Sequence, residues 1–373
     1  MKKLAYITDL ENKPSSGGSY AVNWHVQQQL SKHFEVIAPA PVVPRVSKFE
    51  QFLSRMKRHV FKQPSSFFYF SEAVLDENAN RASRHYSGVD AVFFRSAARW
   101  SHCKPQVPYF VYLDVVFHTF FENTFRQSDF IGSDLERIFQ AEARFLEKAD
   151  AVFFESDWGL QKARQAYSLS GSHYHVAARG GVLEPPEFDT WNEKNLVLLS
   201  IAMNFKQKGG DIILEAFRGL KKSHPDLQWH IIGGKPSGKW ESIDGIVYEG
   251  VLDPGDEVQL ARYRRLLAQA FLLIHPTRED TNPLVLTEAA YFGCPAVSVD
   301  RFAIPELVID GKTGVLLQTP VQPDELANAI GKLIDSPSYY KQMRQNAFKF
   351  SHENFSWNRI GKHMANEIYQ ILV

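Results

Sequence analysis

Short apolar runs alternate with amphipathic segments along most of the chain. In the first half the apolar runs predict buried strands at 4–8, 36–38, 91–95, 109–113, 151–155 and 174–178. Between them, helical spacing of apolar residues predicts helices at roughly 18–32, 72–84, 133–148 and 158–167. Strand–helix alternation of this kind favours a parallel sheet with helices on both faces.

The second half repeats the pattern. Strands are predicted at 196–201, 229–232, 247–249, 271–274, 296–299 and 314–317. Helices are predicted near 210–223, 256–269, 284–292, 323–335 and 338–350. A charged segment with two prolines, residues 183–195, has the composition of a linker between the halves. We therefore expect an α/β protein with two Rossmann-like domains, in which ligands bind at the carboxyl ends of the strands.

Composition narrows the class of protein. The chain has 373 residues, enough for two domains, with 44% hydrophobic and 23% charged residues, as in globular proteins. Its formal net charge is zero, which argues against nucleic acid as a partner. Two distant cysteines, Cys103 and Cys294, do not form a disulfide framework and favour a reducing cytosol. Since no run of 18 apolar residues occurs, we expect a cytoplasmic protein without a membrane span.

The stretch from residue 275 to 300 has the most specific chemistry. Asp280 and Glu288 are separated by seven residues and follow the strand predicted at 271–274. Thr281-Asn282-Pro283 predicts a helix start, with a capping oxygen and then a proline at the first helical position. The free N–H groups of a helix N-terminus attract phosphate. A carboxylate further into the helix can accept hydrogen bonds from sugar hydroxyls, so the layout fits a nucleotide-sugar site.

This stretch resembles the donor-site signature of retaining glycosyltransferases with the GT-B architecture, family 4 (glycosyl transferases group 1), in which two glutamates flank seven residues. Asp280 stands at the first of these positions, which puts the identity of the sugar in doubt. The resemblance implies two Rossmann-like domains that face a cleft. It assigns residues 1–188 to the acceptor side, 189–352 to the donor, and 353–373 to a C-terminal helix that returns to the first domain.

The resemblance also implies roles for residues near other predicted strand ends. Gly17 and Gly18, after the first strand, are similar to a glycine loop that faces the donor phosphates and the acceptor. Lys208, before Gly209, would bind the diphosphate and neutralise the leaving group. The family's preceding arginine is replaced by Ala202, and Lys206 could take its place.

Within the signature, the resemblance implies contacts for each part of the donor. Backbone N–H groups would bind the diphosphate, Asp280 the sugar ring, and Glu288 the ribose. In the first domain, Asp114 and His118 would lie near the reacting sugar or orient the acceptor hydroxyl, although a core role for His118 is equally consistent with the sequence. The residues that present the N–H groups are Thr281, Asn282, Pro283 and Leu284.

No metal or cofactor is expected. The chain lacks the Asp-x-Asp pair with which metal-dependent transferases of the other common fold hold a divalent ion. His173 and His175 could ligate a metal on a strand edge, but without a third ligand nearby a structural role is favoured. Substitution of Glu288 or Lys208 by alanine is expected to abolish transfer and leave thermal unfolding nearly unchanged.

Residues 44–62 form a basic amphipathic segment with six Lys or Arg and a single Glu. Such a helix either packs on its domain with a solvated basic face or lies on an anionic membrane surface, and the first alternative is favoured because amphipathic helices are common in globular domains. The expected partners are a nucleotide-sugar donor and a sugar, lipid-linked or polysaccharide acceptor; the inner face of a membrane, contacted through residues 44–62, is the second alternative.

Two other functions are consistent with the sequence. A nucleotide-sugar epimerase or a phosphorylase would share the two-sheet architecture. A nucleotide-binding protein that has lost catalysis would explain the departures at Ala202 and Asp280. Incubation with candidate donors separates these functions, because transfer, isomerisation and inactivity give different products.

Overall fold

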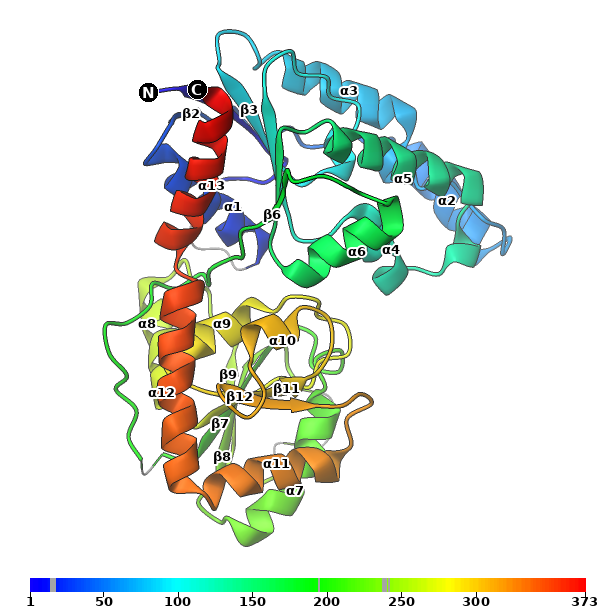
Figure 1. Ribbon diagram of the computed structural model, residues 1–373. Helices are drawn as coiled ribbons and strands as arrows, with labels where there is room; N and C mark the ends of the chain where they lie inside the picture. Colours follow the sequence, from blue (N-terminus) through cyan, green and yellow to red (C-terminus); the bar gives the residue numbers. More distant parts are fainter. Residues whose placement is uncertain (14–17, 194, 237–239, 241) are drawn as a thin grey trace. The chain divides into compact units, whose positions relative to one another are not determined.

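The computed structural model describes residues 1–13, 18–193, 195–236, 240 and 242–373 (Figure 1). The chain divides into two compact units. In the described chain, the first contains residues 1–13, 23–179 and 357–373, and the second contains residues 18–22 and 180–356. Each unit is built on its own six-stranded parallel sheet, which confirms the expected α/β class with two Rossmann-like domains.

The sheet of the first unit has the strand order β2-β1-β3-β4-β5-β6. Helices α1 and α13 lie on one face of this sheet, and α3, α5 and α6 on the other (Figure 1). The elements are β1 (Lys3–Ile7), α1 (Ser19–Ser31), β2 (Glu35–Ile37), α2 (Lys48–His59), η1 (Phe68–Phe70), α3 (Glu72–Ser83), β3 (Ala91–Arg95), η2 (Ala98–Trp100), β4 (Tyr109–Leu113), α4 (Phe117–Thr124), η3 (Gln127–Asp129), α5 (Gly132–Glu147), β5 (Ala151–Phe154), α6 (Asp157–Tyr167), β6 (Tyr174–Val176) and α13 (Trp357–Leu372).

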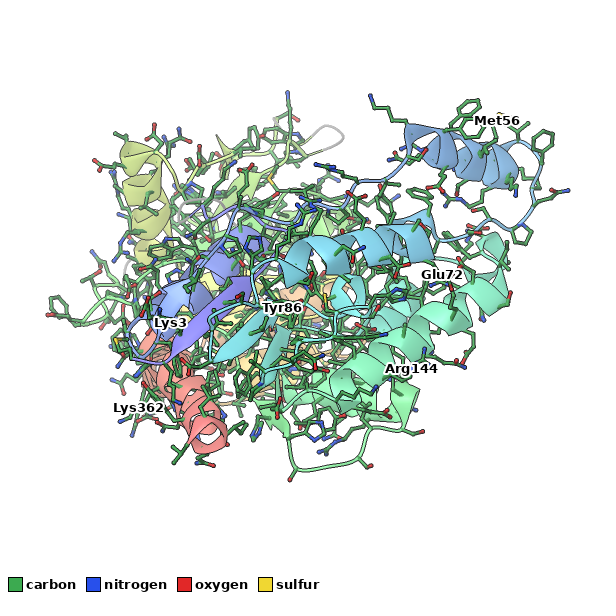
Figure 2. All side chains as sticks on the ribbon, turned by 90° about the horizontal axis from the view of Figure 1, so that it is seen from above. Lys3, Met56, Glu72, Tyr86, Arg144 and Lys362 are labelled. Atoms are coloured by element: carbon green, nitrogen blue, oxygen red, sulfur yellow. The ribbon has the colours of Figure 1, made fainter. Side chains whose placement is uncertain are left out.

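Helix α2 forms from the basic segment and projects from the outer end of the first unit, beyond α3 and α5, where Figure 2 labels Met56. Ser47 begins the helix, and its hydroxyl accepts the Glu50 N–H. Ser54 is the one buried residue of α2, and its hydroxyl lies 2.8 Å from that of Ser65. The apolar side chains of α2 are thus largely exposed, unlike those of a helix packed on a domain.

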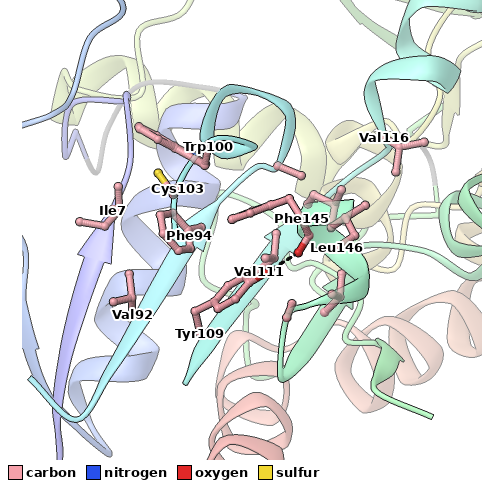
Figure 3. Packing of buried hydrophobic residues seen from close by; sticks show 14 of the residues in the cluster. Ile7, Val92, Phe94, Trp100, Cys103, Tyr109, Val111, Val116, Phe145 and Leu146 are labelled. Atoms are coloured by element: carbon pink, nitrogen blue, oxygen red, sulfur yellow. Dashed lines mark hydrogen bonds between the residues drawn. The ribbon is translucent and has the colours of Figure 1, made fainter. Parts of the chain in front are cut away.

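The core of the first unit lies between the sheet and helices α3, α5 and α6. Rings and aliphatic side chains from β3 and β4 interleave there with Phe145 and Leu146 of α5 (Figure 3). Tyr109 is buried, and its hydroxyl donates to the Phe145 carbonyl at 2.6 Å, so the polar tip of the ring is satisfied. This contact fixes the amino end of β4 against the last turn of α5.

Helix α13 confirms the expectation that the last helix packs on the N-terminal domain. The Trp357 ring stacks on that of His25 in α1, with centroids 5.0 Å apart. Gly361 allows close approach, because a Cβ at this position would lie 2.4 Å from Gln29 Cβ. The Tyr369 hydroxyl donates to the His33 carbonyl at the end of α1. Contacts along the whole helix therefore fix it to the first unit.

The sheet of the second unit has the strand order β12-β11-β10-β7-β8-β9. All of its pairings are parallel, and a helix lies between each two consecutive strands except β8 and β9, between which the described residues form no helix. The elements are β7 (Val197–Ala202), α7 (Gly210–Ser223), β8 (Gln228–Gly233), β9 (Ile246–Gly250), α8 (Glu257–Gln269), β10 (Leu272–Ile274), α9 (Leu284–Tyr291), β11 (Ala296–Val299), α10 (Ile304–Leu307), β12 (Gly314–Leu317), α11 (Pro323–Ile334) and α12 (Pro337–Asn354).

The segment from 183 to 195, expected to be a linker, is held by α12 of the second unit. The Arg344 guanidinium donates to both Asp189 carboxylate oxygens, at 2.5 and 2.8 Å. It also donates to the Ala270 and Phe292 carbonyls. A ring nitrogen of His352 lies 2.9 Å from the Pro186 carbonyl oxygen. Residues 183–195 are therefore held to α12 at Asp189 and at Pro186.

Candidate functional site

Two loops meet at the carboxyl edge of the second sheet. One follows β7 and contains Lys208, and the other follows β10 and contains Asp280. Strands β7 and β10 are neighbours in the sheet, so their carboxyl ends bring the two loops together. The Arg278 N–H donates to the Gln207 carbonyl at 2.9 Å, which joins the loops through the backbone. Ligands of doubly wound sheets bind at this edge.

Lys208 and Asp280 form an ion pair at the centre of the site. Lys208 Nζ donates to Asp280 Oδ2 at 2.5 Å. Burial alone would raise the pKa of Asp280, but His275 and the Lys208 ammonium outweigh it and hold the pKa of this carboxyl well below its usual range. Asp280 is therefore an anion throughout the neutral pH range, and it holds the ammonium group beside the mouth of α9.

Two residues that sequence reasoning missed position Asp280. His275 is buried at the end of β10, and its Nε2 lies 3.5 Å from Asp280 Oδ2. The buried Thr277 hydroxyl accepts the Asp280 N–H at 3.1 Å and the Glu279 N–H at 3.3 Å. The signal was present in the sequence, because two polar residues directly follow a buried strand at the expected ligand edge.

Gly209 makes the close meeting of the two loops possible. Its φ is +77°, and a Cβ at this position would lie 2.3 Å from the Pro276 carbonyl oxygen. A side chain here would therefore combine backbone strain with a clash against the other loop. The Lys208-Gly209 pair thus has a local structural reason, independent of any ligand.

Arg278 is a further residue that the sequence did not single out. Its guanidinium donates to both Asp211 carboxylate oxygens, at 2.8 and 3.0 Å, and to the Lys206 carbonyl. The exposed Lys206 is thus fixed through its backbone, and its ammonium forms no ion pair within the described parts of the chain. Lys206 therefore contributes positive charge beside Lys208.

The mouth of α9 corrects one detail of the sequence analysis. Pro283 precedes the helix as its N-cap, with φ −76° and ψ 118°, and the first helical residue is Leu284. The expected capping oxygen followed by a proline at the first helical position is wrong, because Pro283 itself occupies the N-cap and makes no side-chain cap hydrogen bond. The Thr281 carbonyl instead accepts the Ala303 N–H at 3.0 Å, while Asn282 and Pro283 are buried. The first-turn N–H groups of α9 thus receive no side-chain acceptor at the cap position, which leaves a positive helix end beside Lys208.

Glu288 lies on the second turn of α9 and is buried, with 3% of its surface exposed. Its Oε2 accepts the Tyr263 hydroxyl at 2.6 Å, and its Oε1 accepts the Val182 N–H at 2.8 Å. Gly181 allows this approach, since a Cβ there would lie 2.7 Å from Glu288 Cγ. The carboxylate therefore holds α8 and residues 181–182 against α9. These hydrogen bonds argue against the expectation that Glu288→Ala leaves thermal unfolding nearly unchanged. In the variant the Tyr263 hydroxyl and the Val182 N–H would lose their acceptor.

The remaining candidate residues belong to other parts of the chain. Gly17 lies outside the described residues, and Gly18, with φ +67°, directly precedes α1. Asp114 follows β4 in the first unit and is half-buried. The His118 ring packs on Phe139, with centroids 4.7 Å apart, and its Nδ1 lies 3.5 Å from Glu122 Oε2. His118 thus belongs to an aromatic cluster of the first unit.

The histidines considered as metal ligands are also placed. His175 Nδ1 lies 3.9 Å from Glu367 Oε2, and the His173 ring lies against Tyr174. Among the residues described by the structure, no three His, Cys, Asp or Glu side chains are grouped as metal ligands. Likewise, none of the described helices has both the length and the apolar character needed to cross a bilayer.

Comparisons with known proteins give a family and a fold. Residues 185–350, somewhat less than half of the chain, match the model of the family "Glycosyl transferases group 1". Among curated proteins, the alpha-D-kanosaminyltransferase of Streptomyces kanamyceticus is 22% identical over 242 residues, which cover 60% of this chain and 61% of that protein. The chain thus spans less than two thirds of the length of this relative.

Two solved structures resemble the chain over nearly its whole length. Sucrose-phosphate synthase from Thermosynechococcus elongatus superimposes with a TM-score of 0.68 at 14% identity, covering 100% of this chain and 99% of that one. The HepE protein of Anabaena in complex with UDP-glucose gives 0.64 at 16% identity, covering 99% and 100%. At this level of identity the likeness shows the fold alone. The chain therefore has the GT-B fold, and its residues 185–350 match the model of the glycosyl transferases group 1 family.

Proposed function

We propose that the chain is a retaining glycosyltransferase that moves a sugar from a nucleotide-sugar donor to an acceptor hydroxyl in glycoconjugate biosynthesis. The observation that carries this proposal is the Lys208–Asp280 pair beside the uncapped mouth of α9, inside the family-matched segment. A cation next to free backbone N–H groups is suited to a diphosphate, and a fixed carboxylate is suited to sugar hydroxyls. The complex of HepE with UDP-glucose supports a donor of this class.

In the proposed reaction, the diphosphate lies against the first-turn N–H groups of α9. The bond between the anomeric carbon and the diphosphate oxygen breaks, and that oxygen gains negative charge. Lys208 and Lys206 stabilise this charge as it develops, which is the largest effect that an active site usually supplies. Asp280 accepts from a hydroxyl of the transferred sugar. The acceptor hydroxyl forms the new bond, and its proton leaves with the diphosphate.

Glu288 has a supporting role in this proposal. Its hydrogen bonds with the Val182 N–H and the Tyr263 hydroxyl hold residues 181–182 and α8 around the helix that binds the diphosphate. A contact with the donor ribose, as the resemblance implies, would add to these bonds. No divalent ion is required, because Lys208 and the helix end supply the positive charge; a donor-dependent reaction in a chelating buffer is the expected result.

Incubation with UDP-, GDP- and ADP-sugars tests the function. Released nucleoside diphosphate, together with a product that keeps the donor's anomeric configuration by NMR, would support it. An isomerised donor without release would identify an epimerase. If no donor is consumed above the rate in buffer, the transferase proposal is wrong and nucleotide binding alone remains.

We also propose that α2 contacts an anionic membrane surface. Phe49 and Val60 are 66% and 67% exposed, and the last turn of α2 carries Lys57, Arg58 and His59. An exposed apolar face flanked by basic residues suits the boundary between acyl chains and anionic headgroups. Sedimentation with vesicles of phosphatidylglycerol and phosphatidylcholine should capture the protein, and Phe49→Asp should weaken capture. Equal sedimentation with pure phosphatidylcholine, or no effect of the substitution, would contradict this proposal.

A further inference from the structure

A cavity of about 440 Å³ lies in the first unit, apart from the residues of the proposed donor site. Small-molecule sites have volumes of roughly 300–1,000 Å³, so this cavity has the size of a binding site. Most of its wall is aromatic, and we call it the phenylalanine cavity. It is lined by Pro44, Arg58, Phe67, Phe68, Tyr69, Phe70, Ser96, Ala97, Ala98, Arg99, Val115, Phe117, Phe120, Phe125, Phe130 and Glu142.

The walls of the phenylalanine cavity are fixed by hydrogen bonds and ring contacts. The Phe67 N–H donates to Asp134 Oδ2 at 2.7 Å, and the Arg137 guanidinium donates to the Phe70 carbonyl at 2.7 Å. Both donors and acceptors come from η1 and α5, so these elements frame the space. The Phe67 ring contacts those of Phe117 and Phe130, with centroids 4.8 and 5.4 Å away. A framed apolar space of this kind stays poorly hydrated and favours an apolar ligand.

The two arginines that line the cavity differ in whether they have an anionic partner. Arg58 of α2 lies over the Phe130 ring at 4.9 Å, and its buried Nε has no hydrogen-bond partner. Within the described residues Arg58 forms no ion pair, whereas Arg99 is paired with Asp9. Arg58 is therefore a cation at the edge of an apolar space without an anion of its own. A ligand that supplies an anionic group would satisfy it.

Glu142, the one acid in the wall, is already satisfied. It accepts the Phe117 N–H at 2.7 Å and the Tyr167 hydroxyl at 2.6 Å. Burial raises the pKa of Glu142 to about 7, against the lowering effect of these hydrogen bonds. The Glu142 carboxyl thus accepts hydrogen bonds from the protein itself. Because its pKa is about 7, only part of the population is charged near neutral pH, so its repulsion of an anionic ligand is reduced.

The location of the cavity agrees with a substrate site. Ser96 and Val115 lie directly beyond β3 and β4, at the carboxyl edge of the first sheet. Ligands of such sheets bind at this edge. Arg58 comes from α2, the helix with exposed phenylalanines at the outer end of the unit (Figure 2). The cavity therefore lies beside the segment proposed to contact lipid.

We propose that the phenylalanine cavity binds the apolar chain of the acceptor, an amphiphile whose phosphate or diphosphate lies against Arg58. This inference rests on the proposed transferase function and specifies its acceptor as a long-chain alkyl or isoprenyl phosphate that carries the hydroxyl to be glycosylated. The chain supplies apolar area to the phenylalanine rings, and the phosphate supplies the missing anion.

Calorimetric titration with dodecyl phosphate, below its micelle concentration, tests this inference on the full chain. We expect saturable binding to the wild type, much weaker binding of dodecanol, and none of inorganic phosphate. Phe120 is 47% exposed and lines the cavity, so Phe120→Asp should weaken dodecyl phosphate binding at least tenfold without unfolding the protein. Phe188→Asp, at an exposed residue of the second unit, is the matched control and should bind as the wild type does.

Arg58→Gln supplies an independent variant. It should weaken dodecyl phosphate binding several-fold and leave dodecanol binding unchanged, while Arg55→Gln on the same helix changes neither. Equal binding by wild type and Phe120→Asp, or equal losses for Arg58→Gln and Arg55→Gln, would overturn the inference. If nucleotide-sugars are turned over but dodecyl phosphate does not bind, the cavity assignment alone fails. If dodecyl phosphate binds but no donor is consumed, the proposed transferase function fails and with it the acceptor role.

Discussion

The two candidate sites of this molecule differ in polarity: one is centred on an ion pair, and the other is an aromatic cavity with a cation, Arg58, at its edge. In the second unit, Lys208 and Asp280 form a close ion pair whose charges largely compensate each other. In the first unit, the phenylalanine cavity is apolar and Arg58 lacks an ion-pair partner among the described residues. In such a polar site a phosphate competes with Asp280 for the Lys208 ammonium through charge-assisted hydrogen bonds. An apolar cavity gains most of its binding energy from the ligand's surface instead.

The two sites also differ in their relation to the matched family. The Lys208 site lies in the segment that matches a family model. The phenylalanine cavity lies outside that segment, in residues 44–142. The Lys208 site is thus in the part of the chain that the family model covers, and the phenylalanine cavity is in the part that it does not cover.

Lys208→Ala should have the largest effect on the polar site. Loss of the ammonium removes charge stabilisation from the leaving diphosphate, so kcat should fall by about 10²–10³-fold. The Lys208 side chain is 25% exposed, so thermal unfolding should change little. Steady-state kinetics with the active donor provide the measurement, and Lys222→Ala at the exposed end of α7 provides the control. Turnover near the wild-type value would remove Lys208 from the site.

Glu288→Ala should act mainly on stability and separates support from binding. The substitution leaves the Tyr263 hydroxyl and the Val182 N–H without their acceptor, at about 1–3 kcal/mol each. We expect the free energy of unfolding to fall by roughly 2–6 kcal/mol in urea titrations. Glu288→Gln keeps one acceptor oxygen and should lose less. Wild-type stability of Glu288→Ala would show that these two bonds do not hold α9 in place.

Glu142→Gln probes how apolar the phenylalanine cavity is. The pKa of this carboxyl is raised from 4.5 to about 7 in the folded state, mainly by burial. Between these values the folded chain holds a proton that the unfolded chain releases, so this contribution to stability is present below pH 4.5 and lost as pH rises to about 7. The full effect is about 3 kcal/mol.

The measurement is urea unfolding of the wild type and Glu142→Gln across this pH window. The stability of the variant relative to the wild type should increase by up to about 3 kcal/mol from pH 4.5 to pH 7.5. A pH-independent difference between the two proteins would show that Glu142 has an ordinary pKa, and hence that the cavity wall is well hydrated.

Arg278→Ala should have the smallest effect. The Arg278–Asp211 pair is exposed, so its loss should cost at most about 1 kcal/mol of stability. The guanidinium also orders the backbone at Lys206, so nucleotide binding should weaken by less than about tenfold through a looser loop. Titration of the variant with nucleoside diphosphate measures this effect, with Arg218→Ala on α7 as the control. A loss as large as that of Lys208→Ala would mean that Arg278 binds the donor itself.

The sequence predicted the strands well because their pattern is local. Runs such as 91–95, 109–113 and 296–299 are buried on both faces of a parallel sheet, and the structure has the same bounds. The helix start at residue 284 was also found, although Pro283 occupies the cap and not the first helical position. Its extended ψ of 118° keeps it outside the helix, a backbone choice that the residue types alone do not determine.

What the sequence could not predict depends on contacts between distant residues. The second hydrogen bond of Glu288 comes from Val182, 106 residues earlier. His275 gains its relation to Asp280 only when the loop turns back on Thr277. The phenylalanine cavity collects side chains from positions 44 to 142, none of which forms a motif. The exposure of α2 is likewise set by its place in the fold, since its amphipathic pattern is equally consistent with a packed helix.

The central claim is that a nucleoside diphosphate binds at the mouth of α9 beside Lys208. Calorimetric titration of UDP, GDP and ADP into wild type and Lys208→Ala, in buffer with a metal chelator, tests it most directly. The account predicts that at least one of these diphosphates binds the wild type and that Lys208→Ala binds it at least tenfold more weakly. Equal affinity of the two proteins for that diphosphate, or no binding of any of the three, would contradict the claim.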